Sequence, residues 1–168
     1  MTPLLEVEGL QKRFRMARGA QLHAVEDVSF TLQPRETLGL VGESGCGKST
    51  LARLLARLLD PTGGAVRLRG EEIGAIPAAR FGAMNLRADI QMVFQDAEGS
   101  INPRHTAFEA IARPLRQLKR LSGEALRARV EATAALCGLP PELLGRFPHQ
   151  LSGGQKARVG IARAVATE

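Results

Sequence analysis

The sequence contains no tryptophan, no tyrosine and only two cysteines, Cys46 and Cys137, among its 168 residues. Two cysteines cannot build a disulfide framework or a four-ligand zinc site, which fits a protein of a reducing cytosol. The scarcity of aromatic side chains argues against a stacking platform for single-stranded nucleic acid. The three histidines, His23, His105 and His149, lack the spacing of metal ligands, so we interpret them as surface residues.

Long apolar runs are also missing. The longest stretch without a charged residue, from Ala132 to Pro141, is far shorter than the roughly 18 to 20 residues that a membrane-spanning helix needs. An acid at Glu6 interrupts the N-terminus where a signal peptide would be apolar. These absences predict a globular protein in the cytoplasm.

Basic residues outnumber acidic ones. Lys and Arg total 23 against 17 Asp and Glu, which gives a formal net charge of +6. Such a surplus is compatible with binding to nucleic acid or to an anionic membrane surface. We interpret it instead as solvated surface charge and expect no nucleic-acid partner, because stacking aromatics are nearly absent.

The first third of the chain reads as strands separated by turns. Alternating or wholly apolar runs predict strands at 5–8, 28–32, 37–41, 65–70 and 90–95. Leucines at helical spacing predict a helix over 51–59, with Arg53 and Arg57 on its solvent-exposed side.

From about residue 102 to 148 the apolar period changes from 2 to 3.6. It predicts one helix after Thr106, with a possible kink at Pro114, and a second that begins near Ser122. Seven basic residues lie between Arg104 and Glu131 against three acids, so this helical insert is the basic part of the chain.

The strongest local motif is a phosphate-binding loop. Residues 42–49, Gly-Glu-Ser-Gly-Cys-Gly-Lys-Ser, match the pattern G-x-x-x-x-G-K-[ST] without a mismatch, after a predicted strand and before a predicted helix. Its backbone N–H groups can cradle phosphates at the helix N-terminus, Lys48 can reach the β and γ phosphates, and Ser49 can coordinate Mg²⁺. Cys46 is interpreted as a small residue that the loop tolerates.

A second glycine-rich motif, Leu-Ser-Gly-Gly-Gln, occupies 151–155 and leads into an apolar helical pattern. Ser152 is suited to cap that helix. The serine and the two glycines also offer a hydroxyl and unobstructed N–H donors to a γ-phosphate presented by another molecule.

Taken in order, the loop at 42–49, Gln95 and the motif at 151–155 resemble the Walker A, Q-loop and signature motifs of the ATP-binding cassette ATPases. The resemblance covers essentially the whole chain. It implies an α/β fold, a P-loop NTPase core with an N-terminal antiparallel part, and a helical subdomain. It further implies a head-to-tail dimer of two ATPase subunits that sandwiches ATP between the Walker A loop of one and the signature motif of the other.

The same resemblance implies roles for individual residues. Phe14 matches the aromatic that stacks on adenine, Lys48 and Gln95 are implied in catalysis, and Ser49 and Gln95 in Mg²⁺ binding. The ATP-binding set implied by the family is Phe14, Gly42, Glu43, Ser44, Gly45, Cys46, Gly47, Lys48, Ser49, Thr50, Ser152, Gly153, Gly154 and Gln155.

A finer resemblance surrounds the Q-loop. The run Asp-Ile-Gln-Met-Val-Phe-Gln-Asp at 89–96, followed by Ser-Ile-Asn-Pro-Arg at 100–104, is similar to the ATPases of dipeptide, oligopeptide and nickel importers. It implies a subunit on the cytoplasmic face of the bacterial inner membrane, bound to transmembrane permease subunits and served indirectly by a solute-binding protein. Peptide and nickel both stay open as substrates. The region 97–150 is expected to dock on the permease, with Arg113 and Arg116 as candidate contacts.

The family pattern is incomplete at its end, because no run of four aliphatic residues followed by Asp-Glu, the Walker B motif, occurs in the sequence. We therefore expect an N-terminal fragment of a longer ATPase that binds ATP with little hydrolysis. Its expected parts are a nucleotide-binding core at 1–96, a helical subdomain at 97–150, and the signature motif with its helix at 151–168. The alternatives are a non-catalytic nucleotide-binding module and a soluble cassette protein acting on nucleic acid or ribosomes.

Overall fold

The computed structural model describes residues 2–168, and the backbone separates into two compact units. The first unit ends at Ala83 and the second runs from Met84 to Glu168. The division expected from sequence lies later, after residue 96, so the stretch before Gln95 groups with the helical unit. In the described part, no helix is both long and apolar enough to cross a membrane.

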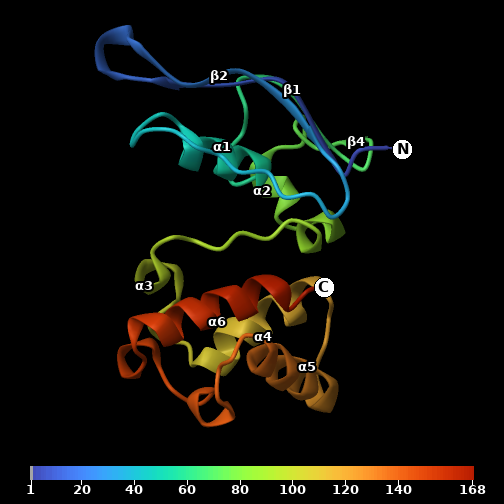
Figure 1. Ribbon diagram of the computed structural model, residues 1–168, viewed down its shortest axis with the longest axis vertical. Coiled ribbons are helices and arrows are strands. Elements are labelled where there is room, and N and C mark those ends of the chain that lie inside the picture. Colours follow the sequence, from blue (N-terminus) through green and yellow to red (C-terminus); the bar gives the residue numbers. More distant parts are fainter. Residues whose placement is uncertain (1) are drawn as a thin grey trace. The chain divides into compact units, whose positions relative to one another are not determined.

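The first unit is built on an antiparallel sheet with the strand order β2-β1-β3-β4. The long strands β1 (Leu5–Arg15) and β2 (Gln21–Leu32) form a ribbon joined by the short 3-10 helix η1 (Ala17–Gly19) (Figure 1). The strands β3 (Gly63–Leu68) and β4 (Glu71–Glu72) complete it. The strands expected at 5–8, 28–32 and 65–70 are thus confirmed.

Apolar side chains of these strands and of the adjoining helices form the core of the first unit. In β1, Val7 lies opposite Phe30 and Val66, and Val7 and Val66 are both buried. Alternation along the strands therefore places one set of side chains inside and leaves the other to solvent. The other fully buried apolar side chains of this unit are Leu10, Leu54, Ile73 and Phe81.

Two helices accompany the sheet in the first unit: α1 (Lys48–Leu55) and α2 (Ala78–Phe81). Leu51 and Leu54 of α1 are buried, as the helical spacing predicted. The helix ends at Leu55 rather than at residue 59, because the backbone turns left-handed at Arg57, where φ is +52°. The exposed position expected for Arg57 is also wrong, since its side chain is fully buried.

The strands expected at 37–41 and 90–95 are not formed. Both stretches are irregular, and Val41 is 97% exposed while Leu38 and Val93 are about half exposed. An apolar parallel strand receives its hydrogen bonds and its cover from neighbouring strands and helices. Among residues 2–168 every strand pair is antiparallel, so neither stretch has a parallel partner.

The second unit is helical. Its longer helices are α4 (Ala107–Leu118), α5 (Gly123–Leu136) and α6 (Gly153–Val165), which pack together as Figure 1 shows. Their shared core is apolar and includes Ile111, Leu115, Val130, Val159 and Ala162. Shorter helices connect them: η2 (Asn85–Ala88), α3 (Ala97–Ser100), η3 (Pro141–Leu143) and η4 (Pro148–Gln150).

The starts of α4 and α5 agree with the sequence. Thr106 caps α4 in a capping box with Glu109, in which each side chain accepts a hydrogen bond from the other residue's backbone N–H at 3.2 Å. Ser122 precedes α5 without a side-chain cap, and Pro114 is accommodated within α4. Both helices expected in this region are therefore confirmed.

Candidate functional site

The phosphate-binding loop at 42–49 curls around the Lys48 side chain. The ammonium donates hydrogen bonds to the carbonyl oxygens of Gly42 and Glu43, both at 2.6 Å, and lies 3.4 Å from the Cys46 sulfur. Residues 43–46 are all exposed. The loop thus holds one positive charge at its centre and stays open to solvent.

Gly47 makes the turn from this loop into α1. It precedes the helix with φ of +95°, and a Cβ there would lie 2.1 Å from the carbonyl oxygen of Ala24 in β2. A side chain is therefore excluded by backbone conformation and by a close approach of the sheet. The close approach brings the loop and the N-terminus of α1 directly against β2.

The donor chemistry of this loop fits a phosphate chain. Ser49 and Thr50 lie in the first turn of α1, where backbone N–H groups without helical partners carry a partial positive charge. The Lys48 ammonium adds a full charge, and the glycines at 42, 45 and 47 keep side chains away from the backbone. The structure brings all of these residues together in the first unit, as the motif predicted.

Phe14 is half-buried near the C-terminal end of β1. The Lys12 ammonium lies over its ring, 5.1 Å from the centroid, and donates a hydrogen bond to the carbonyl oxygen of Asp60 at 2.6 Å. Phe14 also lines an open hollow of about 240 Å³. The other residues around that hollow are Gln11, Arg13, Arg15, Gln21 and Thr62.

The remaining residues expected at the site belong to the second unit. Gln95 is exposed in the irregular stretch before α3. Ser152 caps α6 in a capping box with Gln155: its hydroxyl accepts from the Gln155 N–H at 3.3 Å, and its own N–H donates to the Gln155 side chain at 2.8 Å.

The capping prediction for Ser152 is thus confirmed. A Cβ on Gly153 or Gly154 would meet no atom within 4 Å, so the first turn of α6 is open to solvent. The hydroxyl proton of Ser152 is not used by the cap, because the oxygen acts only as an acceptor there. The motif therefore caps α6 and at the same time exposes the Ser152 hydroxyl and the backbone of Gly153 and Gly154.

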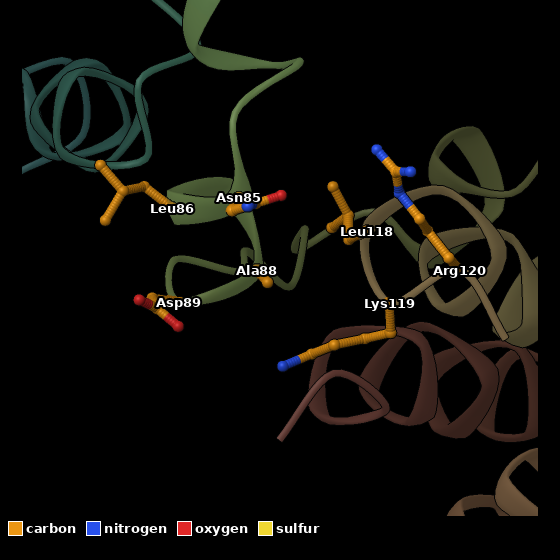
Figure 2. A pocket seen from close by; sticks show the side chains of 7 residues that line it. All are labelled: Asn85, Leu86, Ala88, Asp89, Leu118, Lys119 and Arg120. Atoms are coloured by element: carbon orange, nitrogen blue, oxygen red, sulfur yellow. The ribbon is translucent and has the colours of Figure 1, made fainter.

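A further hollow in the second unit was not expected from sequence. It measures about 530 Å³ and lies between the η2 segment and the end of α4 (Figure 2). The Lys119 side chain extends toward the side on which Asp89 lies, whereas the Arg120 guanidinium points away. The other lining residues are Asn85, Leu86, Ala88 and Leu118.

Of the two segments that line this hollow, sequence patterns single out only the one at the end of α4. The basic residues at the end of α4 belong to the positive stretch between Arg104 and Glu131. The segment 85–89 carries no motif, and only folding brings it beside α4. Arg87 of η2 is partly buried, and this desolvation lowers the pKa of its guanidinium.

The two cysteines have different surroundings. Cys46 is exposed in the phosphate-binding loop, whereas Cys137 is partly buried at the end of α5, where desolvation raises the pKa of its thiol. Among residues 2–168, no group of three or more His, Cys, Asp and Glu side chains is arranged to hold a metal ion.

Comparison with known families gives one match over most of the chain. The family model described as "ABC transporter" matches residues 25–168. A probable peptide ABC transporter ATP-binding protein of Sinorhizobium fredii is 46% identical over 97% of this chain and 47% of its own length. The glutathione import ATP-binding protein GsiA of Escherichia coli K12 is 45% identical over 98% of this chain and 27% of its own.

The chain thus spans about half or less of the length of these curated relatives. Among solved structures, the dimeric post-hydrolysis state of the ATP-binding cassette MJ0796, bound to ADP and Pi, is similar with a TM-score of 0.86 at 28% identity. That likeness covers 97% of this chain and 69% of the other. The cbiO1 protein of Clostridium perfringens, part of the transporter complex cbiONQ, gives a TM-score of 0.76 over 99% of this chain and 62% of its own. The cassette fold expected from sequence is confirmed by these likenesses.

Proposed function

Because the chain belongs to the ABC transporter family, we propose that it is the ATP-binding part of a bacterial importer ATPase. The loop at 42–49 carries this proposal. It places the Lys48 ammonium among exposed backbone groups at the N-terminus of a helix, which is the donor set that a nucleoside triphosphate requires.

In this proposal the residues of the first unit bind the nucleotide. Lys48 transfers its hydrogen bonds from the Gly42 and Glu43 carbonyl oxygens to phosphate oxygens, because a charged acceptor makes the stronger bond. The backbone of 43–47 and the first turn of α1, including Thr50, complete the phosphate site. Phe14 stacks on the adenine.

Mg²⁺ would neutralise charge on the phosphates, and Ser49 is the residue of the first unit that would hold it. Gln95 would supply a second oxygen ligand and position the attacking water. Ser152, Gly153, Gly154 and Gln155 would face the γ-phosphate of a nucleotide held by a second ATPase subunit. The dimeric structures of the MJ0796 cassette support that part of the proposal.

Hydrolysis by these 168 residues is expected to be slow. Phosphoryl transfer depends on charged groups that position Mg²⁺ and water, and the sequence lacks the Asp-Glu pair that ends a Walker B strand. The chain is therefore expected to bind ATP and release little phosphate. Hydrolysis belongs to the longer ATPases of this family.

The transported solute is proposed to be a peptide. The names of the relatives mention a peptide transporter and glutathione import, and glutathione is itself a small peptide. We place the protein on the cytoplasmic face of the inner membrane, with permease subunits as direct partners and a solute-binding protein as an indirect one. The hollow in the second unit is the proposed docking point for the permease, because it combines apolar walls with charge at the end of a basic helix.

Equilibrium titration with Mg-ATP tests the central proposal. Lys48→Ala is expected to weaken ATP binding by roughly 10- to 100-fold, since a charged hydrogen bond contributes about 1.5–3 kcal/mol. Arg53→Ala is the matched control, because this exposed residue of the same helix also loses one positive charge. Equal affinity of Lys48→Ala and the wild-type chain would contradict a phosphate site at this loop.

A further inference from the structure

One contact of the first unit suggests a role that the family motifs do not assign. The Lys12 ammonium lies over the Phe14 ring and is bound at the same time to the Asp60 carbonyl oxygen. We propose that Lys12 is a positioning residue for base recognition, which orients the Phe14 ring for the nucleobase. This inference rests on the proposed ATP site.

The strand geometry places these two residues together. Side chains two positions apart on a strand lie on the same face, and Lys12 and Phe14 are so related on β1. The distance of 5.1 Å from the ammonium to the ring centroid lies within the range of a cation–π contact, which extends to about 6 Å. Lys12 therefore fixes one face of the ring.

A hydrogen bond holds the Lys12 ammonium to the segment that follows α1. Asp60 follows α1 in the chain, 48 positions from Lys12, and its carbonyl oxygen accepts a hydrogen bond from the Lys12 ammonium at 2.6 Å. The same segment is held to β1 by a second bond, because the Thr62 N–H donates to the Gln11 carbonyl oxygen at 2.9 Å. The ammonium that contacts the ring is thus held by the segment that leaves α1, the helix that begins at the phosphate-binding loop.

Orientation of the ring before binding has a physical benefit. A half-buried phenylalanine that must be ordered by its ligand loses conformational entropy on binding, and a ring already held loses less. With the ammonium on one face, the opposite face is the one left for a base. Lys12 then contributes to affinity for the base without touching the nucleotide.

The neighbouring cations do not share this position. Arg13 and Arg15 alternate with Phe14 along β1 and border the open hollow that Phe14 also lines, whereas the cation over the ring is that of Lys12. Arg13 is instead paired with Glu26 at 3.7 Å. Arg13→Met is therefore a matched control that removes one positive charge beside Phe14 and leaves the ring contact intact.

The test compares two ligands that share phosphates and differ in the base. Lys12→Met is expected to weaken Mg-ATP binding by roughly two- to fivefold, the range of an exposed cation–π contact, and to leave binding of inorganic tripolyphosphate unchanged. Lys12→Arg is expected to restore ATP affinity, since guanidinium also binds ring faces. Arg13→Met is expected to match the wild-type chain for both ligands.

Coupling to the ring is tested directly by a double-mutant cycle. In a Phe14→Leu background, Lys12→Met is expected to have no further effect on ATP binding, because the contact through which it acts is gone. If circular dichroism shows that Lys12→Met perturbs folding, Lys12→Gln takes its place. The glutamine amide is uncharged and can still donate a hydrogen bond to the Asp60 carbonyl oxygen.

Three results would overturn the proposal. Lys12→Met could bind ATP as the wild-type chain does, it could lose ATP and tripolyphosphate equally, or its loss could persist in the Phe14→Leu background. Failure of the proposed ATP site gives a different result, in which the wild-type chain binds neither ligand.

Discussion

Lys48 and Arg57 are cations near opposite ends of the same short helix, and their surroundings give them different tasks. Lys48 lies in an open loop, where a phosphate can compete for its ammonium. Arg57 is enclosed, with its guanidinium donating to the carbonyl oxygens of Leu59 and Ile76 and to the Asp60 carboxylate. The same carboxylate oxygen accepts from the N–H of Ala78 at 2.7 Å.

Arg57 thus joins the segment after α1 to the segment before α2 by a few directed bonds. Its side chain is also the largest fully buried one of the described residues. Its Nε has no hydrogen-bond partner, so the guanidinium is not completely compensated. The contribution to stability is therefore positive but smaller than three bonds alone would suggest.

Replacement of Arg57 by Met tests this structural role. We expect Arg57→Met to lower the free energy of unfolding by about 1–3 kcal/mol, because two partly buried hydrogen bonds to carbonyl oxygens lose their donor while Asp60 stays partly solvated. Urea denaturation followed by circular dichroism measures the change. Arg53→Met, which removes an exposed cation from the same helix, should shift the midpoint little, and equal effects of the two variants would contradict the role of burial.

At the scale of the element, the helix starts of the second unit differ in how they are closed. Thr106 and Ser152 each accept a hydrogen bond from the backbone N–H three residues later, and each donates its own backbone N–H to the side chain of that residue. Ser122 stands in the equivalent place before α5 and makes no such side-chain bond. Sequence alone would assign the same role to all three hydroxyl residues.

This difference predicts unequal costs for one kind of substitution. Thr106→Ala is expected to destabilise the chain by about 1 kcal/mol, because one backbone N–H of α4 loses its acceptor. Ser122→Ala is expected to change the free energy of unfolding by only a few tenths of a kcal/mol. Chemical denaturation of both variants measures the two changes in the free energy of unfolding. A larger loss of stability for Ser122→Ala than for Thr106→Ala would refute the assignment of the caps.

For the whole molecule, the arrangement of charge and apolar surface is informative. The exposed cations Arg113, Arg116, Lys119 and Arg120 lie along α4 and just after it, and the last two line the hollow that includes Asp89. In the first unit, the stretch around Val41 leaves apolar side chains in solvent. The two surfaces differ in kind, since the first suits a partner with acidic groups and the second an apolar cover.

Charge reversal tests the proposed docking of the permease. In the full-length ATPase, Lys119→Glu together with Arg120→Glu is expected to weaken association with the permease by roughly tenfold, which corresponds to about 1.4 kcal/mol. Co-purification with detergent-solubilised permease measures the association. The pair Arg113→Glu and Arg116→Glu is expected to act in the same direction.

Arg127→Glu on α5 is the control for docking, because this exposed side chain faces Glu131 and lies outside the hollow. ATP binding should be equal in all of these variants, as none of the changed residues belongs to the nucleotide site. Unchanged co-purification of both charge-reversed pairs would show that the permease binds elsewhere.

Sequence by itself determined the local features of this protein. The loop at 42–49, the cap at Ser152, the strands at 5–8, 28–32 and 65–70 and the helices after Thr106 and Ser122 follow from short-range chemistry: glycines that permit close turns, side chains that accept backbone hydrogen bonds, and apolar periodicity. The family match covers residues 25–168, a range that includes the loop at 42–49 and the motif at 151–155.

Only the tertiary structure decided features that depend on distant partners. The stretches at 37–41 and 90–95 have the composition of parallel strands, yet they stay irregular because a strand exists only when a neighbour accepts and donates its hydrogen bonds. Arg57 is buried because the chain after α1 turns back over it. The hollow near Lys119 and the contact of Lys12 with Asp60 likewise join residues far apart in the chain, which no local pattern records.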